Sequence, residues 1–488
     1  MRGGAKCAAL LVLSLSAACG SEPKKDSGGL SGGGHGGMGG GQAPIGGFAG
    51  VSAGGAAAGA AGATMGGSAG SAVGGSAGAA GNTQLLTGGD GAPLEWSMPA
   101  RASGGDYPDI ALDGAGGLFV VSQGTPASLF AYSAAGFGAV SYDFDDGGAS
   151  PQIAGSSSLP FLAWKGGSAY GELQATTFSG TTFGTIDDLG PVYTYAYDLE
   201  LLYAATSGTA IAFYSNDQDQ VFANFFDGVS WQPQLAVATA PNAGIARLAR
   251  GAIDAQGRAV LVWQQQDGLN GFNDRDAAAA LFDGASWQTS QVVGESGTDS
   301  AGFVDVAVNG AGQGFAVWGG SHLGVRPLDL GSGWGEAANI DPDETWLEDM
   351  VAIAVNEAGQ AVLAWEEQKL YDFVPHLIAA IYDPEAGWSA PQELQASSYL
   401  TGQPSVAIDA GGRAVVAWTS SPGLVAAHYT ASVGWGKSVS VYSGIANSNG
   451  GPSTPRIAID GDTVFLVWGD RNGSGEASLF AARASLPP

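Results

Sequence analysis

The sequence predicts an all-β protein made of repeated small sheets, and three observations support this fold class. First, one phrase recurs about every fifty residues from near residue 108 to the end, as at 406–418. Second, each copy holds short apolar runs separated by Gly-containing turns, with no convincing helix between them. Third, the last copy lacks its final strand, which the start of the array can supply. This period with about four strands per copy is typical of a β-propeller.

The repeat occurs eight times. The second apolar run of each copy ends at an equivalent position: Val121, Trp164, Tyr214, Trp263, Trp318, Trp365, Trp418 and Trp468. The first strands are expected near one residue in each copy: Ile110, Ile153, Leu199, Ala252, Val306, Ile353, Val406 and Ile457. We therefore predict an eight-bladed β-propeller, with seven blades as the alternative because the first three copies are degraded.

Each copy contains the same order of elements. An alternating run such as 353–355 predicts a half-buried first strand. An Asp-x-x-Gly or Asn-x-x-Gly turn follows, in which the Asp or Asn side chain bonds the backbone two residues on and Gly adopts a left-handed conformation. The second strand ends at the repeat Trp, and a variable loop leads to a third strand. A fourth strand begins at a second aromatic residue such as Trp388.

The ends of the array predict how the ring closes. The eighth copy stops after its third strand, at 479–483, and the segment 94–99 reads like the fourth-strand phrase at 387–391. We expect this N-terminal strand to complete the last blade, because closure removes the exposed edges of the array.

Most of the 13 Trp residues occupy repeat positions. A unit reused in every blade needs the same apolar filler each time, so these side chains are expected in the core between blades. Trp346 lies outside both aromatic series and is the one Trp considered as a ligand contact.

The N-terminus has the features of a secretion signal. Arg2 and Lys6 precede an apolar run at 8–15 that is too short to span a membrane. The segment 15–19, Leu-Ser-Ala-Ala-Cys, resembles the lipobox of bacterial lipoproteins, with Leu one residue farther from the Cys than usual. The resemblance implies removal of residues 1–18 and a lipid on Cys19 that anchors the chain to a membrane.

The Gly-Ser pair after Cys19 resembles the pattern of lipoproteins sent to the outer membrane. The expected location is therefore the bacterial outer membrane or cell surface, with a periplasmic or secreted protein as the alternative. Residues 19–92 are mostly Gly, Ala and Ser, which cannot bury enough apolar surface to fold. We predict a disordered tether there, followed by a propeller domain at 93–488.

The charge balance limits the partners. The chain has 17 basic and 45 acidic residues, a formal net charge of −28. Neutralising phosphates requires clustered Lys and Arg, so the sequence excludes nucleic acid as a partner. The acidity fits a soluble extracytoplasmic domain, expected to be a monomer, that attracts cations.

Candidate binding residues lie in the loops that vary among the copies. The second-to-third-strand loops and the blade connectors of a propeller emerge on one face, beside the central channel. A glycan or a protein is the ligand expected there. The candidate ligand-binding residues are Asp267, Asn273, Asp274, Arg275, Glu366, Glu367 and Trp346. His322 and His376 are further polar residues of these loops.

Calcium is the cofactor that the acidic loops suggest, because Ca²⁺ prefers six to eight oxygen ligands. Two sets of side chains are candidates: Asp470, Asn472 and Ser474, and Asp341, Asp343 and Glu344. The first set alternates before a Gly, as at the start of a calcium loop, but Ala481 stands where such a loop carries Glu.

The Asp-x-x-Gly phrase that ends in Trp resembles the repeats of sialidase-like and related bacterial surface propellers, over about residues 94–483. The resemblance implies the propeller fold. Sialidase activity requires three Arg in one pocket, a Tyr nucleophile and an acid. Arg258 and Arg413 occupy repeat turns, so no catalytic residue of that family is assigned.

The sequence favours a membrane-tethered, extracytoplasmic binding or scaffold module for a glycan, a protein or a cation. The alternative is a carbohydrate-active hydrolase or lyase, whose carboxylate pair would come from different blades on the variable-loop face. No catalytic residue is assigned, and enzymatic activity stays open.

Overall fold

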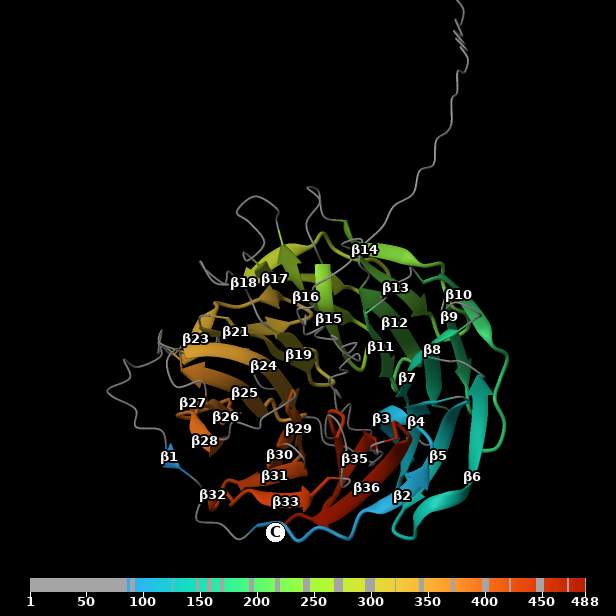
Figure 1. The fold of residues 1–488 in the computed structure, drawn as a ribbon. Helices are drawn as coiled ribbons and strands as arrows, with labels where there is room; N and C mark the ends of the chain where they lie inside the picture. The colour runs from blue at the N-terminus through green and yellow to red at the C-terminus, as the bar shows by residue number, and fades with distance from the viewer. Residues whose placement is uncertain are drawn as a thin grey trace, which may run out of the picture. The chain divides into compact units, whose positions relative to one another are not determined.

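The structure is a computed structural model that describes most of the chain between residues 93 and 487. The described ranges are 86–87, 93–124, 126–145, 149–155, 160–166, 171–192, 197–215, 220–239, 246–266, 275–294, 303–320, 322–341, 346–369, 374–396, 403–420, 423–444, 452–471 and 474–487. The strands in these ranges form eight small antiparallel sheets. Figure 1 shows the sheets side by side in a closed ring, so the protein is the predicted eight-bladed β-propeller.

The blades follow the order of the chain. Blades 1 and 2 contain β3 (Asp106–Leu112), β4 (Leu118–Gln123), β5 (Ala127–Ser133) and β6 (Gly136–Asp145), then β7 (Ala149–Ala154), β8 (Phe161–Gly166), β9 (Glu172–Thr177) and β10 (Asp187–Pro191). Blades 3 and 4 contain β11 (Tyr197–Ala204), β12 (Thr209–Ser215), β13 (Gln220–Phe226) and β14 (Leu235–Thr239), then β15 (Ala246–Ile253), β16 (Ala259–Gln266), β17 (Arg275–Phe282) and β18 (Gln291–Gly294).

The later blades have the same plan, with a short strand at the second aromatic residue in three of them. Blades 5 and 6 contain β19 (Val304–Val308), β20 (Gln313–Trp318), β21 (Leu323–Asp329), β22 (Gly333–Trp334) and β23 (Ala338–Asp341), then β24 (Trp346–Val355), β25 (Ala361–Lys369), β26 (Pro375–Asp383), β27 (Gly387–Trp388) and β28 (Gln392–Ala396). Blades 7 and 8 contain β29 (Ser405–Ile408), β30 (Ala414–Ser420), β31 (Gly423–Thr430), β32 (Gly434–Trp435) and β33 (Val439–Tyr442), then β34 (Arg456–Asp460), β35 (Thr463–Arg471), β36 (Ala477–Ser485) and the N-terminal β2 (Ala100–Ser103).

The N-terminal strand closes the ring. β2 pairs antiparallel with β36, and Trp96 forms an isolated bridge with Ala484. Ser97 also donates its backbone N–H to the Arg483 carbonyl at 2.8 Å. This confirms the predicted closure, because the segment from before blade 1 supplies the fourth strand that blade 8 lacks. The predicted tether lies outside the described residues, apart from β1 (Leu86–Thr87), which pairs parallel with β28 of blade 6.

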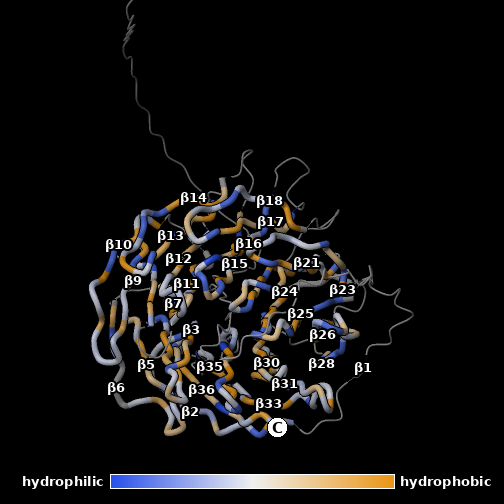
Figure 2. Tube along the Cα trace, turned by 180° about the vertical axis from the view of Figure 1, so that it is seen from behind, coloured by the Kyte–Doolittle hydropathy of each residue, from blue (hydrophilic) through white to orange (hydrophobic). Residues whose placement is uncertain are grey.

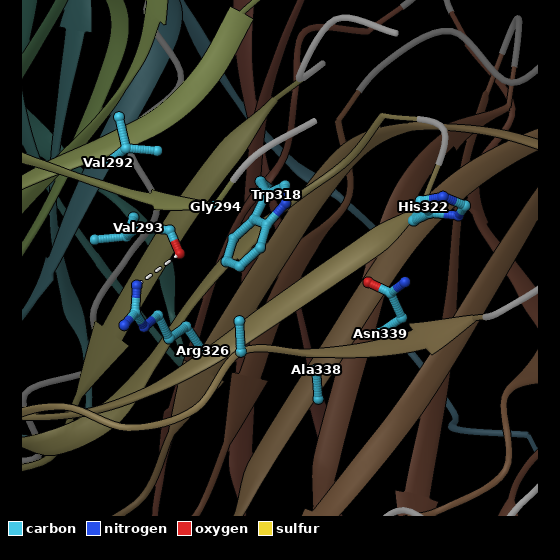
Figure 3. Close-up of a pocket in the computed structure, with 9 residues that line it drawn as sticks. Val292, Val293, Gly294, Trp318, His322, Arg326, Ala338 and Asn339 are labelled. Atoms are coloured by element: carbon cyan, nitrogen blue, oxygen red, sulfur yellow. Dashed lines mark hydrogen bonds between the residues drawn. The ribbon is translucent and has the colours of Figure 1, made fainter. Parts of the chain in front are cut away.

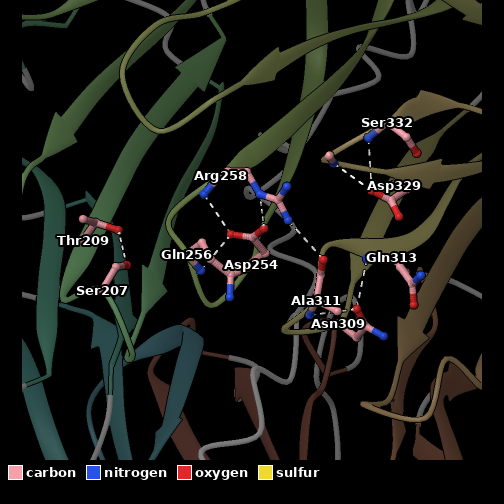
Figure 4. A network of polar contacts seen from close by, with 11 residues as sticks. Ser207, Thr209, Asp254, Gln256, Arg258, Asn309, Ala311, Gln313, Asp329 and Ser332 are labelled. Carbon is pink, nitrogen blue, oxygen red and sulfur yellow. Dashed lines mark hydrogen bonds and ion pairs between the residues drawn. The ribbon is translucent and has the colours of Figure 1, made fainter. Parts of the chain in front are cut away.

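The Asx–Gly turns between first and second strands have the predicted geometry. In blade 4, Asp254 Oδ1 accepts the backbone N–H groups of Gln256 and Arg258 at 2.9 and 2.8 Å. Gly257 has a φ of +84°, a conformation that favours glycine. The Arg258 guanidinium donates to Asp254 Oδ2 at 2.6 Å and to the Ala311 carbonyl of the next blade at 3.1 Å (Figure 4). Arg258 therefore stabilises turns, as its repeat position indicates.

The apolar core is divided among the junctions between blades. Eight clusters of buried side chains each join two neighbouring blades. Figure 2 shows apolar residues along strands all around the ring. Trp164, Trp263, Trp365, Trp418 and Trp468 are 0 % exposed, which confirms the predicted core role of these five.

Candidate ligand-binding pocket between blades 4 and 5

Three of the described junctions cover the repeat Trp with a long side chain from the preceding blade. Trp418 Nε1 donates to Gln395 Oε1 at 2.7 Å. The ring centroids of Tyr442 and Trp468 are 5.2 Å apart, and those of Phe144 and Trp164 are 5.0 Å apart. In each case the covering residue belongs to the fourth strand of the blade before, which fills the space over the indole.

The junction between blades 4 and 5 departs from this plan, because Trp318 meets glycine on both sides. Gly294 ends β18 in blade 4, and Gly324 lies opposite Trp318 in β21. A Cβ atom added at either glycine would overlap the Trp318 indole. At the position of Gly324, blade 6 has Ile378 opposite Trp365. Trp318 is 5 % exposed, and the backbones of the two glycines pack against its indole.

A pocket of about 510 Å³ opens beside Trp318. Small-molecule sites typically have volumes of about 300–1,000 Å³ and apolar walls with a few polar groups. The described lining residues are Val292, Val293, Gly294, Trp318, His322, Arg326, Ala337, Ala338 and Asn339. Figure 3 shows Trp318 between Arg326 on one side and His322 and Asn339 on the other.

Arg326 is held in place by backbone carbonyls. Its Nε donates to Gly335 O at 2.9 Å and its Nη1 to Val293 O at 3.1 Å (Figure 3). The guanidinium carbon also lies 5.9 Å from the centroid of the Trp334 ring, in the range of a cation–π contact. No acceptor for Nη2 is found in the described part of the chain. The guanidinium is therefore fixed beside the pocket with donor capacity left.

His322 and Asn339 are the other polar side chains at the pocket. His322 stands just before β21, and its buried Nδ1 has no partner among the residues that the structure describes. Asn339 is exposed and lies opposite Gly324 in the register of β21 and β23. The equivalent pair in blade 6, His376 and Glu393, is in contact, with Nδ1 and Oε2 3.0 Å apart.

The pocket does not contain the predicted ligand-binding residues that are described. Arg275 begins β17, and Glu366 and Glu367 lie in β25. Glu367 is 1 % exposed and accepts a hydrogen bond from Trp365 Nε1 at 3.3 Å, so it supports the core of blade 6. Trp346 begins β24 and Asp341 ends β23, but their side chains are not among the described parts. These predicted residues lie outside the described ranges altogether: Cys19, Asp267, Asn273, Asp274, Asp343, Glu344 and Asn472.

The calcium prediction stays a prediction. In the described ranges, no group of three or more His, Cys, Asp or Glu is arranged to hold a metal ion. Asp470 is 1 % exposed and accepts a hydrogen bond from the Tyr442 hydroxyl at 3.0 Å. Ser474 is described, but its predicted co-ligand Asn472 is not, so the first set cannot be assembled from the described residues.

A second polar cluster surrounds the centre of the ring, at one register position of the first strands. It comprises Asp109, Glu200, Arg250, Asp305 and Arg456, all buried. Arg456 Nε lies 3.4 Å from Asp109 Oδ1, and Arg250 Nε 3.5 Å from Glu200 Oε1. The sequence signal, a charged residue just before the repeat Ile, Leu or Val, was available but was overlooked.

The acidic members of this cluster join one blade to the next. Asp109 Oδ2 accepts the Ile153 N–H and Asp305 Oδ2 the Ile353 N–H, both at 2.9 Å. Burial raises the pKa of Asp305 to about 6, although the two backbone N–H donors and Arg250 oppose the shift. The cluster therefore holds neighbouring blades together. The pocket beside Trp318 is the better candidate for ligand binding.

The described ranges contain no helix that is long and apolar enough to cross a membrane.

Comparisons with known proteins agree with the fold. No family model matches the sequence, and no curated protein matches it. A six-bladed fungal lectin of Aleuria aurantia, described with a novel fucose recognition mode, is 13% identical, covers 59% of this chain and 92% of its own, and has a TM-score of 0.35. A protein of unknown function from Dyadobacter fermentans is 10% identical, covers 81% of this chain and 100% of its own, and has a TM-score of 0.40.

Prolyl oligopeptidase B from Galerina marginata is 11% identical over 78% of this chain and 56% of its own, with a TM-score of 0.41. Identities this low concern the fold alone. The protein is therefore classed by its own sheet topology, as an eight-bladed β-propeller with a pocket at one blade junction.

Proposed function

We propose that this propeller is a non-enzymatic binding module that holds a small polar ligand in the pocket between blades 4 and 5. The observation that carries the proposal is the pocket beside Trp318, whose indole packs between Gly294 and Gly324 and whose lining brings together Arg326, His322 and Asn339. The volume of about 510 Å³ suits a ligand of one or a few sugar or amino-acid units.

The chemistry of the pocket supports binding rather than catalysis. Its described lining residues include an indole floor, valine and alanine walls, and the polar groups of Arg326, His322 and Asn339. Glycoside hydrolysis, the alternative function, requires two carboxylic acids that flank the scissile bond. The described lining residues supply none, whereas fixed donors on rigid strands are what a binding site needs.

Closing the pocket tests this proposal. Ala337 is exposed, lines the pocket and precedes Ala338, so by strand alternation its side chain lies on the same face as Asn339. Ala337→Trp should therefore fill the opening and weaken ligand binding by about tenfold or more. Pro391→Trp places the same side chain at the equivalent position of blade 6 and serves as the control. The measurement is calorimetric titration of both variants and the native chain with monosaccharides, sugar acids and N-acetylated amino acids.

The proposal is wrong if no member of this panel binds the native chain, or if Ala337→Trp binds a ligand as tightly as the native chain does. Thermal unfolding of the variants checks that each still folds.

The proposal extends to location: the module is displayed outside the cytoplasm on a lipid attached to Cys19. Its support is the sequence Leu-Ser-Ala-Ala-Cys at 15–19 and the Gly, Ala and Ser composition of 19–92. A flexible segment of about seventy residues would span roughly 45 Å, enough to hold a binding domain away from a membrane surface.

A further inference from the structure

We infer that the pocket between blades 4 and 5 selects ligands that carry a carboxylate group. This inference rests on the proposed function and names the chemical class of the ligand. Three features carry it: the hydrogen-bonding groups that line the pocket, the lack of a described carboxylate partner for Arg326, and a comparison of blade 5 with blade 6.

The described lining groups are mostly donors. Arg326 donates from Nε to Gly335 O and from Nη1 to Val293 O, which leaves Nη2 as a donor for a ligand. The Trp318 indole N–H has no acceptor among the described residues, and indole nitrogen can only donate. Sugar hydroxyls need acceptors as well as donors, and here the Asn339 amide oxygen is the main side-chain acceptor besides the His322 ring. A carboxylate, which only accepts, fits this set better than a neutral hydroxyl cluster.

The charge of Arg326 is not neutralised within the described part of the protein. The following arginines each lie within 4 Å of a carboxylate: Arg250, Arg258, Arg413, Arg456 and Arg471. Arg326 has only carbonyl dipoles and the Trp334 ring as described partners. In a chain with 45 acidic and 17 basic residues, a fixed arginine without a described carboxylate partner is available to a ligand anion.

Blade 6 has different side chains at the same positions. By strand register, His322 and Asn339 correspond to His376 and Glu393, which form an ion pair when the histidine is protonated. Arg326 corresponds to Ala380, since Arg326 lies opposite Ala316 and Ala380 lies opposite Leu363. Relative to blade 6, blade 5 therefore has an amide in place of a carboxylate and a cation in place of a methyl group.

The ligand expected is a small organic acid with a polar body, and its carboxylate can belong to a sugar acid or to an amino acid. The experiment separates these sources by titrating two matched pairs: methyl glucuronide against methyl glucoside, and N-acetylserine against N-acetylserine amide. Members of each pair differ mainly in the presence of a carboxylate. The native chain should bind the acid of at least one pair about tenfold or more tightly than its neutral partner.

Two variants test whether Arg326 and Asn339 cause that preference. Arg326→Gln removes the charge and should bring the affinity ratio of the pair close to one. Asn339→Glu installs the blade 6 residue at an exposed position and should disfavour the acid. Lys437→Gln removes an exposed cation from blade 7 and is the control for a general charge effect, so its ratio should match that of the native chain. If Arg326→Gln does not fold, the affinity ratio measured for Asn339→Glu decides whether the pocket causes the carboxylate preference.

The outcomes separate this inference from the proposed function. Equal binding of acids and neutral partners, abolished by Ala337→Trp, would overturn the carboxylate preference and leave the binding pocket standing. A preference that survives both Arg326→Gln and Asn339→Glu would overturn it too. No binding of any of the four compounds or of the wider panel would overturn both.

Discussion

At the scale of single residues, buried carboxylates of the first strands join neighbouring blades. Asp305 lies in β19 of blade 5, and its Oδ2 accepts the Ile353 N–H of blade 6 at 2.9 Å. Its Oδ1 accepts the Val306 N–H at the same distance. The residue is 2 % exposed, so the carboxylate has exchanged water for these backbone donors. The same contacts that hold the blades together thus place a titratable group in the core.

The titration of Asp305 should appear in the stability of the protein. Burial raises its pKa in the folded state from 3.8 to about 6, so between these values the folded chain binds more protons than the unfolded chain. The contribution of this group to the free energy of unfolding is therefore largest below pH 4. It falls by about 3 kcal/mol as the pH rises to about 6. Asp305→Asn should remove this fall, as measured by urea unfolding from pH 4 to pH 7.5.

Asp283→Asn is the matched control for that measurement. Asp283 lies in an exposed turn, where backbone N–H donors lower its pKa, so its effect on the pH slope has the opposite sign. An Asn amide has only one acceptor oxygen, so each substitution also loses a hydrogen bond and lowers the free energy of unfolding at every pH. The comparison therefore concerns the slope of that free energy against pH and not its absolute value. Identical slopes for Asp305→Asn and the native chain would show that Asp305 does not titrate in this range.

At the scale of elements, five of the eight first strands share a bulge. The strand register shifts just before Asp109 in β3, Gln152 in β7, Glu200 in β11, Arg250 in β15 and Ala352 in β24. Four of these bulges contain a non-glycine residue with positive φ: Tyr107, Ser150, Leu248 and Met350. Such backbone is costly outside glycine and persists where packing enforces it. The repetition of the bulge indicates that it belongs to the blade plan.

The closing strand β2 gives the sharpest prediction for an element. Deleting 93–103 removes four residues paired with β36 and leaves that edge open. At roughly 1 kcal/mol for each hydrogen bond, before the loss of apolar contacts, the unfolding free energy should fall by at least about 4 kcal/mol. Urea unfolding measures this loss, and size-exclusion chromatography detects association through the open edge.

Deleting 20–85 is the control for β2, since it removes a longer stretch but none of the pairing with β36. It should leave the unfolding midpoint unchanged. If both deletions have equal effects, strand closure does not stabilise the ring.

At the scale of the whole molecule, the proposed lipid anchor and the propeller have separate roles. Cys19→Ser should move the protein from the membrane fraction to the soluble fraction of the producing cell, because one lipid-bearing residue supplies the attachment. Ligand affinity should stay the same, since the pocket belongs to blades 4 and 5. Fractionation, with mass spectrometry of the mature N-terminus, measures the change. Cys7→Ser is the control, and membrane association of the Cys19 variant would contradict the anchor.

The blade plan was predictable because its causes are local and repeated. Asp254 and Gly257 form their turn through a side-chain bond and a left-handed backbone, both of which depend on residue type alone. The alternation of apolar residues marks the strands, and the missing last strand marks the closure. Each copy repeats these signals, so the strands of a degraded copy can be placed by comparison with the other copies.

The pocket was not predictable in the same way. Trp318 belongs to the core series, and the sequence assigned it to filling space between blades. In the structure its indole packs between Gly294 and Gly324, from two different blades, and a pocket opens beside it. Alone, each glycine would be expected to mark only a close backbone approach or a weak strand position.

The sequence by itself therefore determined the propeller fold, the turns of the blades and the closure of the ring, because those follow from short-range chemistry repeated along the chain. Only the tertiary structure, with eight blades, decided the number left open between eight and seven, and it decided where a pocket opens. That depends on which side chains of adjacent blades meet across a junction, and such contacts are fixed by packing between segments that are not neighbours in the chain.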